Sequence, residues 1–120
     1  MRHAQPAGYR GRMPSRTLLG PADLQLALGN LPHWNCPDGR AIARDVAFED
    51  FAAAFGFMTA VAAVAEELDH HPDWSNSWNR VAIRLSTHDR GGVTEFDVEL
   101  ARHIDRLVHA HGGRSTGPAG

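Results

Sequence analysis

Apolar residues recur every three or four positions in three segments of the chain, which predicts three helices. The first covers residues 21–31 and begins at a proline, which suits a first helical turn. The second covers residues 49–68 and carries two neighbouring apolar stripes, so we expect it to be largely buried against a sheet. The third follows Thr94 to about residue 111, with Thr94 and Asp97 spaced nearly as in a capping box.

Strict alternation of apolar and polar residues predicts a strand over residues 78–87. A second strand is expected over residues 40–48, after an Asp-Gly pair typical of a hairpin turn. Arg44 interrupts its apolar face, which indicates an unusual register or an edge position. Another short strand is expected around residues 74–76. This mixture of elements favours an α+β fold with an antiparallel sheet and helices packed on one face.

The length of 120 residues is enough for one domain with one core. We place this domain at residues 17–111. Residues 1–16 contain glycine, proline and four arginines without apolar periodicity, which predicts a disordered basic tail. Within it, Met13 is a second candidate for the start of translation. Residues 112–120 are rich in glycine and polar residues and predict a flexible tail.

Composition narrows the classes of function. The net charge of −2 offers no basic footprint for nucleic acid, and no apolar run approaches the length of a membrane span. All 12 basic residues besides histidine are arginine, which is typical of a GC-rich, bacterial coding bias. The single cysteine, Cys36, excludes an internal disulfide and a multi-cysteine zinc site, and a free thiol suits the cytoplasm.

Three of the eight histidines stand at predicted element ends. His70, His71 and His88 lie among Asp69, Asp73 and Asp89, whereas the other five lie in the first tail, in a loop or on the last helix: His3, His33, His103, His109 and His111. Histidine can donate or accept a proton near neutral pH, so the three clustered residues could perform acid and base steps. They could equally be ordinary loop histidines.

A metal site is the less favoured interpretation of the cluster. Adjacent histidines such as His70 and His71 project in different directions, and no His-x-x-x-His pair or cysteine supports them. Three neighbouring residues also have two interpretations each. Asp97 could be only a helix cap, Glu66 only a solvated helix residue, and Trp74 either core or a flat face for a ring-shaped ligand.

Four motifs stand out between residues 66 and 97. They are Glu66-x-x-x-His70-His71-Pro72, the Asp-Trp pair after it, Thr87-His88-Asp89 and Asp97. Together they resemble the signature of the pterin-4a-carbinolamine dehydratases. Residues 48–58 and 91–94 add to the likeness, which spans about residues 17–108. The resemblance implies a four-stranded antiparallel sheet with helices on one face, and homodimers or homotetramers. It also implies dehydration of 4a-hydroxytetrahydropterin to quinonoid dihydropterin without a metal or organic cofactor.

The same resemblance implies roles for individual residues. His70, His71 and His88 match the active-site histidines, and our hypothesis makes His70 and His88 the acid/base pair. Glu66, Trp74 and Asp97 match residues that line the pterin pocket of the family. Two further acids beside the histidines complete our substrate-binding candidates: Asp69 and Asp89.

Two other functions stay open at this stage. Animal members of the family stabilise dimers of a homeodomain transcription factor, so a non-catalytic pterin- or protein-binding module is an alternative. A dehydratase-like protein of molybdopterin metabolism is another. In the leading interpretation the protein serves tetrahydrobiopterin recycling, with a functional link to an aromatic amino acid hydroxylase.

Overall fold

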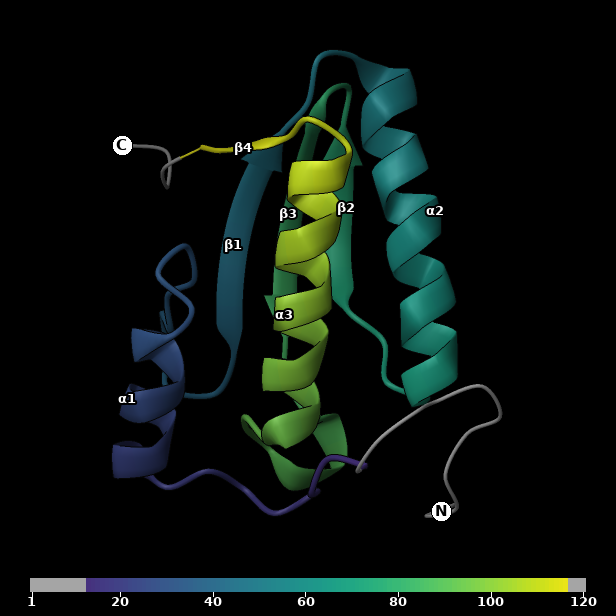
Figure 1. Ribbon diagram of the computed structural model, residues 1–120. Coiled ribbons are helices and arrows are strands. Elements are labelled where there is room, and N and C mark those ends of the chain that lie inside the picture. Colours follow the sequence, from purple (N-terminus) through teal and green to yellow (C-terminus); the bar gives the residue numbers. More distant parts are fainter. Residues whose placement is uncertain (1–12, 117–120) are drawn as a thin grey trace.

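The computed structural model describes residues 13–116. Its helices are α1 (Pro21–Gly29), α2 (Phe51–Leu68) and α3 (Glu95–Ala110), with a short 3-10 helix, η1 (His88–Arg90), before the last of these. Its strands are β1 (Ile42–Ala47), β2 (Asp73–Ser77), β3 (Arg80–Leu85) and β4 (Arg114–Ser115). They form one antiparallel sheet in the order β2-β3-β1-β4, which confirms the predicted α+β class (Figure 1).

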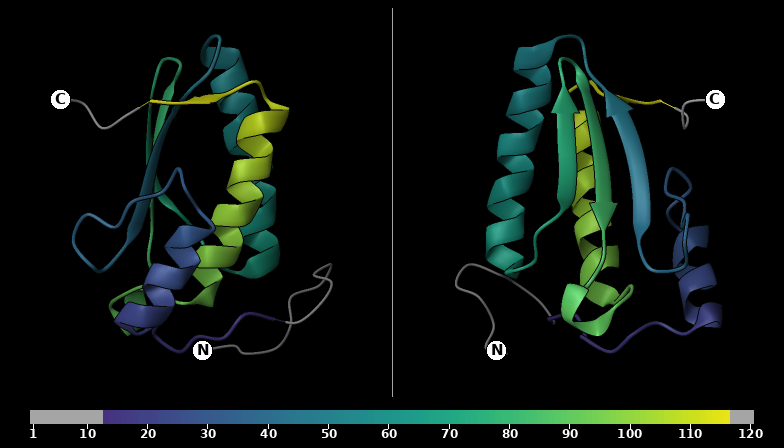
Figure 2. Two further views of the ribbon diagram at one scale, coloured as in Figure 1. Left: turned by 60° about the vertical axis from the view of Figure 1, so that its left-hand side comes forward. Right: turned by 180° about the vertical axis from the view of Figure 1, so that it is seen from behind.

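Helices α2 and α3 cover one face of the sheet, and the view from behind shows the other face uncovered (Figure 2). The alternation along β3 explains this layering, because Val81, Ile83 and Leu85 are buried while Arg80 and Ala82 are exposed. The largest fully buried side chains belong to one core cluster. They come from strands, loops and helices, and they include Ile42, Phe48, Phe57, Leu31 and Ile104.

The predicted elements are present with shifted ends. The short strand expected around residues 74–76 is β2, and it pairs with β3 as a tight hairpin. The expectation that residues 78–87 are all strand is wrong at its start, because Trp78 has a φ of 50° and forms the hairpin turn. This left-handed conformation reverses the chain between β2 and β3, and the Trp78 side chain is left exposed.

Arg44 interrupts the apolar face of β1 because it has a partner inside the protein. Arg44 is only 6% exposed, and its guanidinium donates through Nη1 to Asp105 Oδ1 on α3. Trp34 Nε1 donates to the same oxygen at 2.8 Å. The strand keeps its regular register against β3, and a partly buried charge pair replaces one apolar contact.

Both predicted tails differ from expectation in their described parts. Residues 112–120 were expected to be flexible, but Arg114 and Ser115 pair with β1 and Gly113 packs closely on Phe48. Residues 1–16 were expected to be disordered, but Ser15 and Arg16 bond to side chains near the start of α3. These contacts join distant parts of the chain, so local composition did not reveal them. The rest of both tails, residues 1–12 and 117–120, lies outside the described residues.

Helix α2 is less buried than its two apolar stripes predict. The stripe containing Ala54, Phe57 and Val61 is buried against the sheet, whereas Phe51 and Phe55 are about half exposed, at 49% and 54%. By length and apolar composition alone, α2 could also cross a membrane, contrary to the expectation from the sequence. One such helix is weak evidence for a span, because the core helix of an ordinary domain has the same properties.

Candidate active site

Several chain segments meet at one end of the molecule, the lower end in Figure 1. These are the C-terminal end of α2, the end of β3 with η1, and the N-terminal end of α3. Helix α2 ends where the histidines begin, because Asp69 adopts the left-handed conformation with φ 52° and Pro72 follows. The His70 amide then donates to the Ala65 carbonyl at 3.0 Å, which holds the histidine directly beneath the helix.

His70 and Asp97 form the buried pair of the site. His70 Nε2 lies 2.6 Å from Asp97 Oδ1, and the two residues are 8% and 0% exposed. The other carboxylate oxygen, Oδ2, accepts from the Thr87 hydroxyl and the Thr94 amide, both at 2.9 Å. The same Asp97 therefore caps α3 in a complete capping box and also holds His70.

The surroundings of Asp97 determine which nitrogen of His70 carries a proton. Two donors already satisfy Oδ2, and this pattern suits an ionised carboxylate. An ionised carboxylate only accepts, so His70 Nε2 must donate to Oδ1. The remaining nitrogen, Nδ1, is then the one that is able to accept a proton and return it.

The other two candidate histidines are paired as well, but at the surface. His71 Nε2 lies 2.6 Å from Glu66 Oε2, and His88 Nε2 lies 2.7 Å from Asp73 Oδ2. The two imidazoles are 55% and 69% exposed. Each of the three histidines thus has its own carboxylate, and only the first pair is shielded from water.

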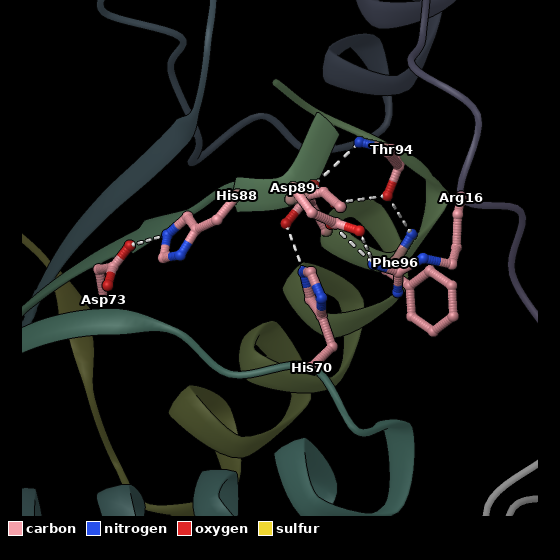
Figure 3. A network of polar contacts seen from close by, with 9 residues as sticks. Arg16, His70, Asp73, His88, Asp89, Thr94 and Phe96 are labelled. Atoms are coloured by element: carbon pink, nitrogen blue, oxygen red, sulfur yellow. Dashed lines mark hydrogen bonds and ion pairs between the residues drawn. The ribbon is translucent and has the colours of Figure 1, made fainter. Parts of the chain in front are cut away.

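Asp89 is bonded to an arginine instead of a histidine. Arg16 Nη2 lies 2.7 Å and 2.9 Å from the two oxygens of Asp89, and Figure 3 shows the side chain reaching over the Phe96 ring. The hydrogen bond from this guanidinium holds the pKa of the Asp89 carboxyl below its usual value. The Phe96 ring in turn lies 5.4 Å from the ring of His70.

Two further sequence candidates have other contacts. Asp69 is exposed, and its backbone N–H caps the C-terminal end of α2. Trp74 lies on β2 opposite Ile83 and is half-buried against the core, which supports the core interpretation for at least part of its ring.

The structure adds residues that the sequence analysis did not select. Asp73 starts β2 and His88 follows β3, so the hairpin brings them to the same end of the sheet. The weakly indicated short strand was the only signal for this pairing. Nothing in the sequence indicated Arg16 as a site residue, because it stands in a segment without periodicity. Thr87 entered the sequence analysis only as part of the Thr87-His88-Asp89 motif.

The arrangement suits proton transfer. It combines a buried imidazole of fixed orientation with two exposed imidazoles, each paired with a carboxylate. Within residues 13–116, no three side chains of His, Cys, Asp or Glu are grouped so that they could hold a metal ion.

Comparison with known proteins gives a consistent result. The family model described as pterin 4 alpha carbinolamine dehydratase matches residues 17–107. A protein of Bordetella avium, designated a candidate pterin-4-alpha-carbinolamine dehydratase, is 54% identical over 72% of this chain and 81% of its own length. One of Burkholderia vietnamiensis with the same designation is 57% identical over 67% of this chain and 79% of its own length.

A solved structure agrees with both. The crystal structure of a transcriptional coactivator/pterin dehydratase from Brucella melitensis is 46% identical, with a TM-score of 0.73, and the match covers 76% of this chain and 98% of that one. The family match spans most of the chain, including α1, α2, all but the last three residues of α3, and the candidate histidines. The chain therefore belongs to the pterin 4 alpha carbinolamine dehydratase family, a family of lyases.

Proposed function

We propose that the protein dehydrates a 4a-hydroxytetrahydropterin to the quinonoid dihydropterin and water. The observation that carries this proposal is the buried His70–Asp97 pair, with Asp97 saturated by Thr87 and Thr94. An imidazole held in one orientation and one tautomer by a buried carboxylate is a common design for a general acid or base. Family membership and the designations of the relatives support the choice of substrate class.

The reaction requires two proton transfers on the substrate. The leaving 4a-hydroxyl takes a proton and departs as water, and the proton on N5 is removed as the new double bond forms. We assign these steps to His70 and His88, and we assign substrate positioning to His71. His70 would act through Nδ1, because Nε2 is engaged with Asp97. Each general acid or base typically contributes about 10²–10⁴-fold to a rate.

The test is the rate of 4a-hydroxytetrahydropterin dehydration by the wild type and by His70→Ala. We expect the wild type to accelerate the reaction over buffer and the variant to lose at least about ten-fold in kcat with its fold intact. His109→Ala removes an exposed imidazole at the far end of α3 and should behave as wild type. A folded wild type that does not accelerate the reaction would refute the proposal for this substrate.

A second candidate function is protein binding, alone or together with catalysis. The Brucella relative is described as a transcriptional coactivator as well as a pterin dehydratase. In the present chain, Phe51 and Phe55 form an exposed apolar pair on α2. The same face would suit self-association into a homodimer or homotetramer, which we propose as the form in solution. A stable complex with a protein partner, formed by a chain without dehydratase activity, would favour this alternative.

The physiological setting is a further part of the proposal. We propose a cytoplasmic protein that recycles the pterin cofactor of an aromatic amino acid hydroxylase, with molybdopterin metabolism as the alternative. A gene for such a hydroxylase beside the gene for this chain would support recycling. Assays with several 4a-hydroxypterins would identify the preferred ring substituent.

A further inference from the structure

Residues 13–19 form an ordered segment that crosses the end of the molecule carrying the histidines, and we term it the N-terminal strap. The Leu19 amide donates to the Val93 carbonyl at 2.9 Å, and the Ser15 amide donates to Glu95 Oε1 at 3.0 Å. Leu18 lies so close to Gly92 that a Cβ at that glycine would meet its Cδ2 at 2.9 Å. The strap is therefore attached along its length to the turn before α3.

Arg16 is the strap residue whose side chain bonds to η1. Both Asp89 oxygens lie within 2.9 Å of its Nη2, and its side chain is only 17% exposed. The guanidinium carbon also lies 5.4 Å from the centre of the Phe96 ring, over its face. The planar guanidinium thus makes two contacts at once, one ionic and one with an aromatic ring.

Each of these two contacts leads to one half of the proposed acid/base pair. Asp89 directly follows His88 in the short helix η1, so fixing Asp89 restricts the backbone that carries His88. Phe96 directly precedes Asp97, and its ring lies 5.4 Å from the ring of His70. Figure 3 shows Arg16 on one side of this network, His88 on the other, and His70 reaching it from below.

We infer that Arg16 is a positioning residue for the histidine site. It holds η1, and with it His88, in place relative to the first turn of α3, which carries Phe96 and Asp97. This inference rests on the proposed function, since it concerns the same two histidines. A displacement of about 1 Å between catalytic groups can cost about 10²-fold in rate, so a small movement of η1 would be measurable.

The kinetic test compares Arg16→Ala and Arg16→Lys with the wild type. We expect Arg16→Ala to lower kcat about ten-fold with KM changed less than about two-fold, because geometry changes more than substrate binding. Arg16→Lys keeps the positive charge but not the planar fork, so it should recover part of the loss. Arg106→Ala removes an exposed arginine on the distant half of α3 and should leave kcat unchanged.

The spectroscopic test does not need activity. The ring proton signals of His70 and His88 should shift in Arg16→Ala and move back toward their wild-type positions in Arg16→Lys. They should stay in place in Arg106→Ala. If the wild type proves inactive on pterins, the proposed function fails, and these ring signals alone decide whether Arg16 positions the histidines.

Several outcomes would overturn the inference. If the wild type is active, an unchanged kcat for folded Arg16→Ala overturns the inference, whatever the ring signals show. If the wild type is inactive, ring signals of His70 and His88 that do not shift in Arg16→Ala overturn it. If Arg16→Ala does not fold, Asp89→Asn replaces it, because this nearly isosteric change removes the charge pair from the other side. Wild-type kcat and wild-type ring signals in that variant would count equally against the inference.

Discussion

At the scale of single residues, the three imidazole–carboxylate pairs differ chiefly in their burial. His70 and Asp97 are 8% and 0% exposed, whereas His71 and His88 are both more than half exposed. Exposed ion pairs typically stabilise a fold by only about 0–1 kcal/mol, because water and salt screen them. A buried carboxylate with three partners cannot lose one without leaving a polar group unsatisfied. His70–Asp97 is thus the pair whose geometry the fold itself maintains.

Replacing Asp97 by Asn should change the tautomer of His70 while keeping the fold. The amide oxygen can accept from Thr87 and Thr94, which places the amide NH₂ group opposite His70 Nε2. Nε2 must then accept, and the proton moves to Nδ1. We expect Asp97→Asn to lower kcat by about 10²–10⁴-fold and the free energy of unfolding by about 1–3 kcal/mol. Steady-state kinetics, urea unfolding and imidazole ¹⁵N shifts measure the three effects.

Glu66→Gln provides the matched control, since it makes the same acid-to-amide change at the exposed His71 pair. Its effect on the free energy of unfolding should stay within about 1 kcal/mol. An Asp97→Asn variant with wild-type kcat, or with the proton of His70 still on Nε2, would contradict the assignment of Nδ1 as the reactive nitrogen.

The sequence indicated His70, His71 and His88 as candidates by their places at predicted element ends, and the motif resemblance added Glu66 and Asp97. The sequence was not sufficient to pair them. That Asp73 faces His88 follows from the hairpin between β2 and β3, and that Asp89 faces Arg16 follows from the path of the strap. Such partners depend on register and on contacts between distant segments, which a single sequence specifies only weakly.

At the scale of elements, the same division holds. Helix ends were predictable where a local signal marks them, as at the capping box of Thr94 and Asp97. Strand β4 could not be predicted from the sequence, because it consists of only two residues after two glycines and so has no periodicity of its own. It forms because β1 presents an open edge at Val46 and Ala47 and because Gly113 allows the chain to pass close to the core.

Gly113→Ala tests this account of β4. A Cβ at this position would lie 2.5 Å from Phe48 Cε2 and 2.9 Å from Val108 Cγ1, both of which belong to buried residues. We expect the variant to lose about 1–3 kcal/mol of unfolding free energy, as measured by urea denaturation. Gly29→Ala, where no atom lies within 4 Å of the new Cβ, should be neutral or slightly stabilising. Equal effects at both positions would show that the C-terminal segment is not held as described.

At the scale of the whole molecule, one face of α2 has no partner within the described chain. Phe51 and Phe55 stand one turn apart with ring centres 5.7 Å apart, and both are about half exposed. Light scattering should give the wild type at least twice the chain mass of 13.1 kDa, and the double variant Phe51→Ser, Phe55→Ser a lower mass. Leu26→Ser removes a single exposed leucine on α1 and should leave the mass unchanged. An unchanged mass in the double variant would place any self-association elsewhere.

Two surface carboxylates paired with arginine contribute to the response of the fold to acid. Hydrogen bonds from Arg84 and Arg16 hold the pKa values of Asp38 and Asp89 below their usual 3.8. A carboxyl whose pKa is lower in the folded state stabilises that state above its unfolded-state pKa, and the contribution disappears as the pH falls through the folded-state pKa. Both pairs should therefore stabilise the protein at neutral pH, begin to lose this contribution below about pH 4, and lose the rest as the pH falls through the lower folded-state pKa.

Arg84→Ala isolates one of these pairs. Above about pH 5, the variant should be less stable than the wild type by a small, constant amount, since both partners are exposed and screened by water. Below about pH 4 the difference should shrink toward zero, because Asp38 takes up a proton in both proteins. Urea unfolding between about pH 3 and pH 7 measures this difference. The control is Arg106→Ala, because the Arg106 guanidinium bonds to His103 and not to a carboxylate. The stability difference between this variant and the wild type should be the same at about pH 5 and at about pH 3. A gap between wild type and Arg84→Ala that persists in acid would mean that Arg84 stabilises the sheet by packing and not by its charge.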